Sequence, residues 1–151
     1  MKVEPPIVAF LRGVAPDSHG RLISDIWAFS DTEIERTHTF IQWLFPLAEP
    51  SLSSPGSPTL HADDIAALRG LNAARENILR SADWYGAFLG RNLHWKVRYD
   101  HNHLRITRVI KSLRLLVSDD EANRFRDSVF TLLGDDLGVI DKKAKSFWNK
   151  A

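Results

Sequence analysis

The sequence contains no cysteine among its 151 residues, which excludes disulfide bonds, thiolate catalysis and cysteine-based zinc sites. It also lacks an excess of either charge, because 20 Lys and Arg residues stand against 19 Asp and Glu residues. A dedicated nucleic-acid-binding domain carries a clearly basic balance, so we do not expect nucleic acid to be a partner. Any basic patch on this protein must therefore be local.

Long hydrophobic runs are absent as well. The apolar run at residues 7–11 stops at Arg12, is too short to span a membrane, and is not followed by a signal cleavage site. Together with the absence of cysteine, this predicts a soluble protein of the cytoplasm. A chain of this length can bury one continuous core, so we predict a single domain over residues 1–151.

The densest group of large apolar residues is the stretch His38-Thr39-Phe40-Ile41-Gln42-Trp43-Leu44-Phe45-Pro46. Wound as a helix, its apolar side chains cover more than half of the circumference, and His38 and Gln42 fall on the remaining polar strip. Ser30 and Glu33 have the spacing of a capping box, and Pro46 marks the other end. The pattern predicts a central helix over 31–46 that other elements enclose.

Further helices are indicated by apolar residues at three- and four-residue steps and by capping and stop residues. The clearest is 102–117, where Ile106, Val109, Ile110, Leu113, Leu116 and Val117 form one stripe. We expect a short C-terminal helix over 141–149, docked through Ile140, Ala144, Phe147 and Trp148. The remaining helices are predicted at 22–29, 59–70, 72–90 and 118–134, and residues 6–12 could be a short helix, which we favour, or an extended arm.

Residues 15–20 are predicted as a turn from their Pro, Gly, Asp and Ser, and two further segments are not predicted as helices. The Ser- and Pro-rich stretch 49–58 reads as a surface loop, and 91–100 could be extended or a loop pinned by its aromatic residues. The fold class that follows is all-α: a single-domain, irregular bundle of about six or seven helices around the central apolar helix, with the 102–117 helix against it.

A second polar group precedes the 102–117 helix, where the chain reads His101-Asn102-His103-Leu104-Arg105-Ile106-Thr107-Arg108. Arg105 falls at the edge of the apolar stripe, so we expect it to be partly buried and to need a carboxylate or carbonyl partner. Helix N-termini also attract anions.

Both stretches resemble elements of the opioid growth factor receptor conserved domain, H-x-Y-I-Q-W-L-F-P and H-N-x-L-R-I-T-R. Residues 10–13 and 16–21 resemble the start of the shorter, bacterial-type members, and the similarity covers roughly residues 7–134. Phe40 stands where the family has Tyr, which removes a hydroxyl, and the Ser/Pro-rich repeat tail of the animal receptor is absent. The resemblance implies a receptor-like domain, but we do not carry opioid binding over to this chain.

The two polar groups give one candidate ligand pocket, because Arg side chains beside an aromatic wall suit an anionic or amphipathic ligand such as a peptide terminus. Its residues are His38, Gln42, His101, Asn102, Arg105 and Arg108. A structural network is the alternative: His38 would bond to Asn102 or a backbone carbonyl, and Arg105 would pair with Asp25 or Glu35.

A metal site is a weaker alternative, since His38, His101 and His103 offer three imidazoles. Four cations on the 102–117 helix spread over about half of its circumference, which is typical of a solvated face: Arg105, Arg108, Lys111 and Arg114. No nucleophile motif, zinc motif or phosphate loop occurs, and we expect no cofactor. The sequence thus favours a non-enzymatic module that binds a peptide or protein partner. A small-molecule-binding enzyme or a metal-binding protein that uses the His/Arg cluster is the alternative, and oligomeric state is not predicted.

Overall fold

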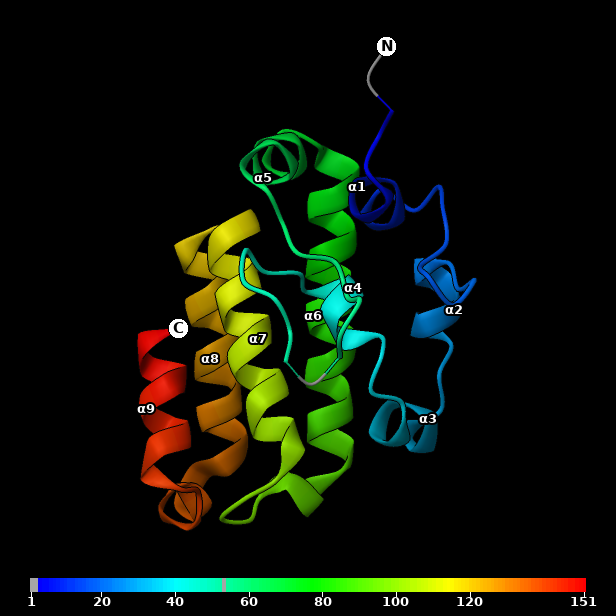
Figure 1. The fold of residues 1–151 in the computed structure, drawn as a ribbon. Coiled ribbons are helices and arrows are strands. Elements are labelled where there is room, and N and C mark those ends of the chain that lie inside the picture. The colour runs from blue at the N-terminus through cyan, green and yellow to red at the C-terminus, as the bar shows by residue number, and fades with distance from the viewer. Residues whose placement is uncertain (1–2, 53) are drawn as a thin grey trace. The chain divides into compact units, whose positions relative to one another are not determined.

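The computed structural model describes residues 3–52 and 54–151, which form nine α-helices, two 3₁₀ helices and one isolated β-bridge (Figure 1). The all-α class and the irregular helical arrangement are confirmed, with more and shorter helices than the six or seven expected. By contact density the chain divides into two compact units, one ending at Ser81 and the other beginning at Ala82. Within the described residues, no helix combines the length and the apolar character that crossing a membrane requires.

The first unit is built from short helices. α1 packs against both α4 and α5. The Ser- and Pro-rich loop that joins α4 to α5 is closed at its base, where Leu60 N–H donates to Leu47 O at 2.8 Å. That loop is largely exposed in its described residues, as predicted. Its helices are α1 (Pro6–Leu11), α2 (Ile23–Trp27), α3 (Asp31–Arg36), α4 (Ile41–Leu44), α5 (Ala62–Arg69) and the first half of α6 (Asn72–Arg91).

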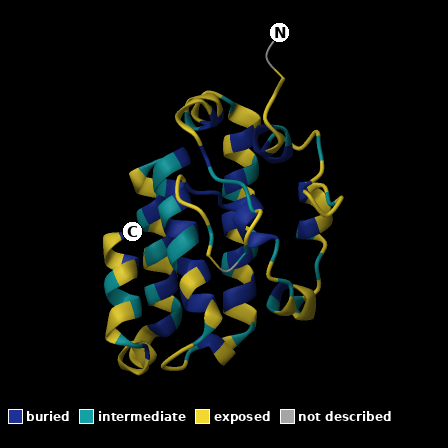
Figure 2. Ribbon diagram, in the orientation of Figure 1, coloured by how far each residue is buried: buried dark blue, intermediate teal, exposed yellow. Residues whose placement is uncertain are grey.

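The predicted central helix is wrong in one respect, because α3 and α4 are separate helices with residues 37–40 between them. The capping box is confirmed: Glu33 N–H donates to Ser30 Oγ, and Ser30 N–H donates to Glu33 Oε1. Thr37 then turns the backbone to an extended conformation, at φ −87° and ψ 123°. Enclosure is also confirmed, since every residue over 40–47 is buried and α4 is dark blue throughout in Figure 2.

The second unit consists of longer helices that lie side by side, with α7 packed against both α8 and α9 (Figure 1). The predicted stripe on α7 is confirmed, because five of its six residues are buried and Val117 is half-buried. Its elements are the second half of α6, η1 (Leu93–Trp95), α7 (His101–Leu116), α8 (Asp119–Leu133), η2 (Gly134–Val139) and α9 (Lys142–Lys150).

Local chemistry fixes where the helices of the second unit begin and end. Asp100, Ser118 and Asp141 cap α7, α8 and α9, each by accepting a hydrogen bond from a backbone N–H of the first turn. Gly134 ends α8 with a φ of +49°, a conformation that a side chain would strain. In segment 91–100, which the sequence left open, Arg91 ends α6 and the rest is a loop with one 3₁₀ turn, pinned by the fully buried Trp95.

Candidate functional site

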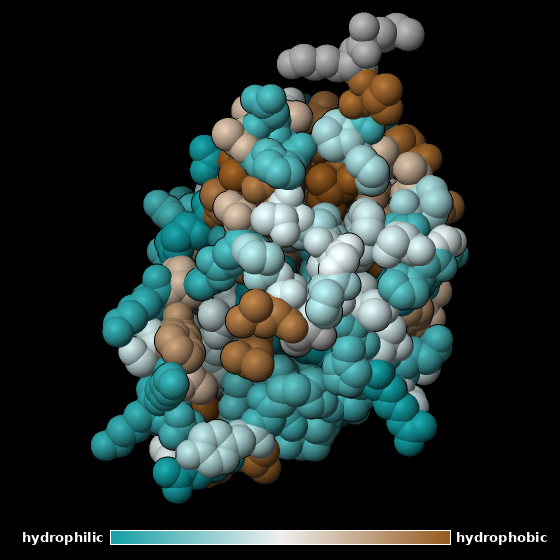
Figure 3. Space-filling view, viewed as in Figure 1, coloured by the Kyte–Doolittle hydropathy of each residue, from teal (hydrophilic) through white to brown (hydrophobic). Residues whose placement is uncertain are grey.

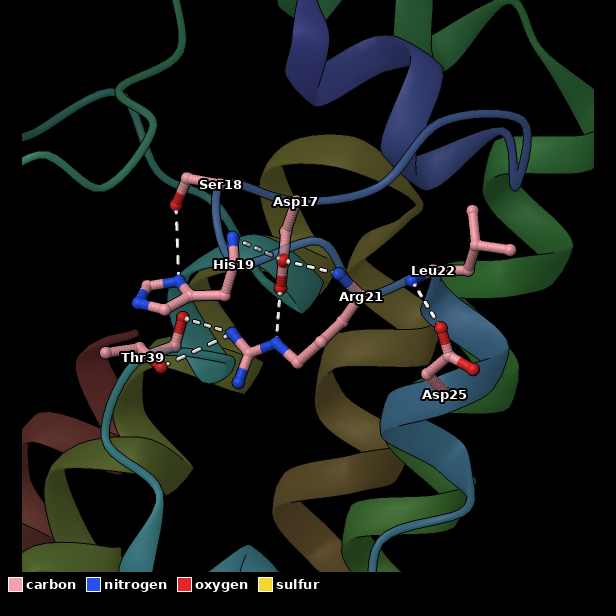
Figure 4. Close-up of polar contacts among 7 residues, drawn as sticks. All are labelled: Asp17, Ser18, His19, Arg21, Leu22, Asp25 and Thr39. Carbon is pink, nitrogen blue, oxygen red and sulfur yellow. Dashed lines mark hydrogen bonds and ion pairs between the residues drawn. The ribbon is translucent and has the colours of Figure 1, made fainter.

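In the first unit, a loop holds the beginning of the stretch that carries His38 and Gln42 (Figure 4). The Asp17 carboxylate is completely buried and accepts from the backbone N–H groups of His19 and Arg21 and from Arg21 Nε, at 2.8–3.0 Å. Arg21 Nη2 then donates to the carbonyl and the hydroxyl of Thr39, both at 3.3 Å. The Thr39 carbonyl is thus bonded to a side chain instead of a helical N–H, within the segment that separates α3 from α4.

The two candidate residues of this first stretch differ in environment. His38 is exposed, whereas Gln42 is 4% exposed and lies on α4 among apolar neighbours in sequence. Gln42 Oε1 is buried and has no hydrogen-bond partner among the described residues. A buried amide oxygen without a donor costs free energy, so this atom does not stabilise the fold.

In the second unit, the residues of α7 that face inward are bonded to one another. Asn102 is fully buried and its Oδ1 accepts from Tyr85 Oη at 2.6 Å and from Arg105 Nη1 at 3.4 Å. Arg105 was expected to be partly buried and is more deeply buried than that, at 5% exposure. Asn102 Nδ2 donates to Asp100, the N-cap of the same helix. Asn102 and Arg105 therefore form a polar network inside this unit.

His103 is also used structurally. Its Nε2 lies 2.8 Å from Trp95 O and must donate, because a carbonyl oxygen only accepts. This nitrogen is not available to a metal ion. The Trp148 indole packs edge-on against the His103 ring, and its Nε1 donates to His103 O at 3.1 Å. The N-terminal turn of α7 is thereby joined to α9.

The outward residues of the same turn border a groove of about 540 Å³ between the start of α7 and α9. Three of its lining residues are large and exposed: Leu104 at 70%, Tyr99 at 69% and Phe147 at 43%. The full lining is Tyr99, Asp100, His101, His103, Leu104, Asp141, Lys143, Ala144 and Phe147. In the part of Figure 3 over α9, apolar side chains emerge between hydrophilic ones.

A second hollow of about 450 Å³ adjoins this groove and shares Asp141 with it. Arg98 and Lys142 border the second hollow. The Arg98 guanidinium lies 5.3 Å from the centre of the Tyr99 ring, and Lys143 Nζ lies 5.8 Å from the centre of the Phe147 ring. Each exposed aromatic ring of the groove is therefore accompanied by a cation.

The sequence of this chain matches the family described as the opioid growth factor receptor (OGFr) conserved region over residues 15–130, more than half of its length. The chain belongs to this family. Opioid growth factor receptor of Rattus norvegicus is 32% identical over 116 residues, which cover 63% of this chain and 20% of that protein. The protein of the same name from Homo sapiens is 29% identical over 119 residues, covering 63% and 17%.

Opioid growth factor receptor-like protein 1 of Rattus norvegicus is 31% identical over 104 residues, covering 58% of this chain and 22% of that protein. The chain thus spans about a fifth of the length of the curated relatives it matches. No solved structure matches it. One wall of the groove, Tyr99 to Leu104, lies inside the OGFr conserved region, and the other wall, Asp141 to Phe147, lies beyond it.

The six candidate residues do not share one environment. Asn102 and Arg105 are buried, Arg108 is half-buried, and His101 is exposed and borders the groove. His38 and Gln42 belong to the first unit. Sequence reasoning missed Leu104. It could have been found because it is a large apolar residue that lies outside the apolar stripe of α7. Sequence reasoning also misplaced Phe147: the docking of Ile140 and Trp148 is confirmed, but Phe147 is exposed because adjacent helical residues point about 100° apart.

Proposed function

We propose that this chain is a non-enzymatic module that binds a peptide or protein segment in the groove between the start of α7 and α9. The observation that carries the proposal is the exposure of Leu104 on the lip of a concave surface, within the second family motif. An exposed apolar side chain beside a hollow gains free energy when a partner covers it. The volume of about 540 Å³ lies in the range of ligand-binding pockets.

The polar groups of the groove support binding over catalysis. Asp100 and Asp141 accept hydrogen bonds from the first turns of α7 and α9, and His103 Nε2 donates to Trp95 O. These bonds give Asp100, Asp141 and His103 structural roles at the ends of α7 and α9. The relatives are named as receptors, which agrees with a binding role.

A peptide-display selection on the whole chain tests the proposal. Random peptides are selected on the wild type and then compared on Leu104→Asp and on a matched control, Leu52→Asp. Leu52 is 94% exposed and belongs to the first unit, so its substitution tests the effect of an added charge alone. Circular dichroism melts confirm that both variants are folded.

We expect selected peptides to bind the wild type and Leu52→Asp equally and to lose at least about ten-fold in affinity on Leu104→Asp, because a carboxylate in an apolar contact must be desolvated. Peptides that bind all three proteins equally, or a selection that yields no peptide, would overturn the groove as a binding site.

A further inference from the structure

We infer that the segment bound in this groove is acidic and carries an apolar anchor residue. The inference rests on the proposed function and adds the chemistry of the partner. Its starting point is the composition of α9, which forms one wall: Lys142–Lys150 contains four lysines and no acidic residue. On a chain with a net charge of +1, this is a local concentration of positive charge.

Three exposed cations stand at the groove or at the second hollow that adjoins it. Arg98 has a side chain that is 72% exposed, and Lys142 and Lys143 are exposed as well. Arg98 Nε lies 4.0 Å from Asp141, too far for a hydrogen bond, so its donors remain accessible to a second carboxylate. Lys143 lies beside Phe147 in the groove itself.

Two carboxylates, Asp100 and Asp141, stand against the three cations Arg98, Lys142 and Lys143 at the groove and the hollow beside it. Asp100 accepts hydrogen bonds from the N–H and the Nδ2 of Asn102, and Asp141 accepts from Lys143 N–H. As N-caps, both also face the positive ends of their helix dipoles. With three cations against two carboxylates, the charge presented to a partner is positive, beside the apolar lining residues Leu104, Ala144 and Phe147.

Two other anionic occupants fit the geometry less well. Single-stranded nucleic acid binds by stacking its bases on aromatic faces, but Arg98 and Lys143 already lie by the rings of Tyr99 and Phe147. A lipid surface is met by apolar side chains that protrude from a helix face, whereas here they line a hollow. An acidic peptide places its anchor in the hollow and its carboxylates on the cations.

The test uses three fluorescein-labelled peptides of equal length with one shared Leu-x-x-Phe core, flanked by glutamates, by glutamines or by lysines. Fluorescence anisotropy measures their affinity for the whole chain. The charge-reversed protein is the double variant Arg98→Glu with Lys143→Glu. The matched control is Arg124→Glu, since Arg124 is 77% exposed and lies on α8 of the same unit.

We expect the glutamate peptide to bind the wild type about ten-fold more tightly than the glutamine peptide does, and its binding to weaken as the salt concentration rises. This difference in affinity should disappear on the double variant and persist on Arg124→Glu. Leu104→Ser should weaken both peptides about ten-fold, which reports the anchor.

Equal affinity for the glutamate and glutamine peptides would overturn the inference and leave the proposed function standing. The same holds if display selection yields groove-dependent peptides while none of these three binds. Binding of oligo(dT) or of phosphatidylserine vesicles that depends on Arg98 and Lys143, without binding of the glutamate peptide, would also overturn it. Loss of groove-dependent binding in every assay would remove the proposed function itself.

Discussion

The two family motifs use their residues in opposite ways. The first, His38–Pro46, is irregular: its helix begins only at Ile41, Thr39 bonds to the Arg21 side chain, and nearly all of its residues are buried. The second, His101–Arg108, lies on one continuous helix with a buried face and an exposed face. A motif in a regular helix can support the core and meet a partner at once, because its side chains alternate between two sides. In the first motif, only the end at His38 is exposed.

The largest expected effect concerns how the second motif is joined to α9. Trp148→Ala should lower the free energy of unfolding by about 3–5 kcal/mol, because it empties the space of a fully buried indole and removes its bond to His103 O. Urea titration followed by circular dichroism measures the loss. Phe147→Ala is the control and should cost far less, since Phe147 is exposed. Equal losses in the two variants would contradict the packing of α9 through Trp148.

The next effect concerns the loop that holds the first motif. Asp17→Asn should lower the free energy of unfolding by about 3 kcal/mol, because it removes the charge that the half-buried Arg21 pairs with. The control is Asp25→Asn on the exposed cap of α2, for which a loss of at most about 1 kcal/mol is expected. Chemical denaturation of both variants tests the difference. A loss no greater than that of the control would show that Arg21 does not depend on Asp17.

The contrast between the two family motifs also explains which parts of the fold could be predicted from the sequence. The stripe, cap and ends of α7 depend on residues within one or two turns, so periodicity located that helix to within one residue at each end. In the break between α3 and α4, by contrast, Thr39 bonds to Arg21, which is 18 residues away in sequence. Local patterns carry no information about such a distant donor, and a continuous helix was the reasonable prediction.

The groove could not be predicted for a related reason. Its walls come from residues 99–104 and 141–147, and the choice between Phe147 and Trp148 for burial is made by the surface of α7 and α8. Helical periodicity indicated that α9 docks, but both aromatic residues fitted the docked face about equally well. The exposed one became part of the candidate site.

A smaller effect of opposite sign is expected at Gln42 in the first motif. Gln42→Met keeps the length of the side chain and removes a buried acceptor that has no partner among the described residues, so the free energy of unfolding should rise by about 1 kcal/mol. Thermal and urea unfolding measure the change. Gln42→Glu, which buries a charge at the same position, should destabilise instead. A loss of stability in Gln42→Met would mean that the amide is bonded in solution.

The smallest expected change in stability is for breaking an exposed ion pair of the first unit, which contrasts with the buried pair at Asp17. Arg12 donates to both oxygens of Glu4 at 2.7 and 2.9 Å, and these hydrogen bonds lower the pKa of Glu4 below its ordinary value. A lowered pKa adds stability at neutral pH that disappears as the pH falls through the lowered value. Because the pair is exposed, solvent screens it, and Arg12→Gln should leave the melting temperature at neutral pH almost unchanged.

A carboxyl NMR titration should nevertheless show the pKa of Glu4 rising in Arg12→Gln, since the donor that favours the charged carboxylate is lost. The buried pair of Asp17 and Arg21 and this exposed pair share nearly the same bond lengths. If Arg12→Gln destabilised the chain as much as Asp17→Asn, burial would not be what makes the loop at Asp17 important. Comparing the stability lost in the two variants therefore tests whether an ion pair of this geometry stabilises the loop at Asp17 only because the pair is shielded from water.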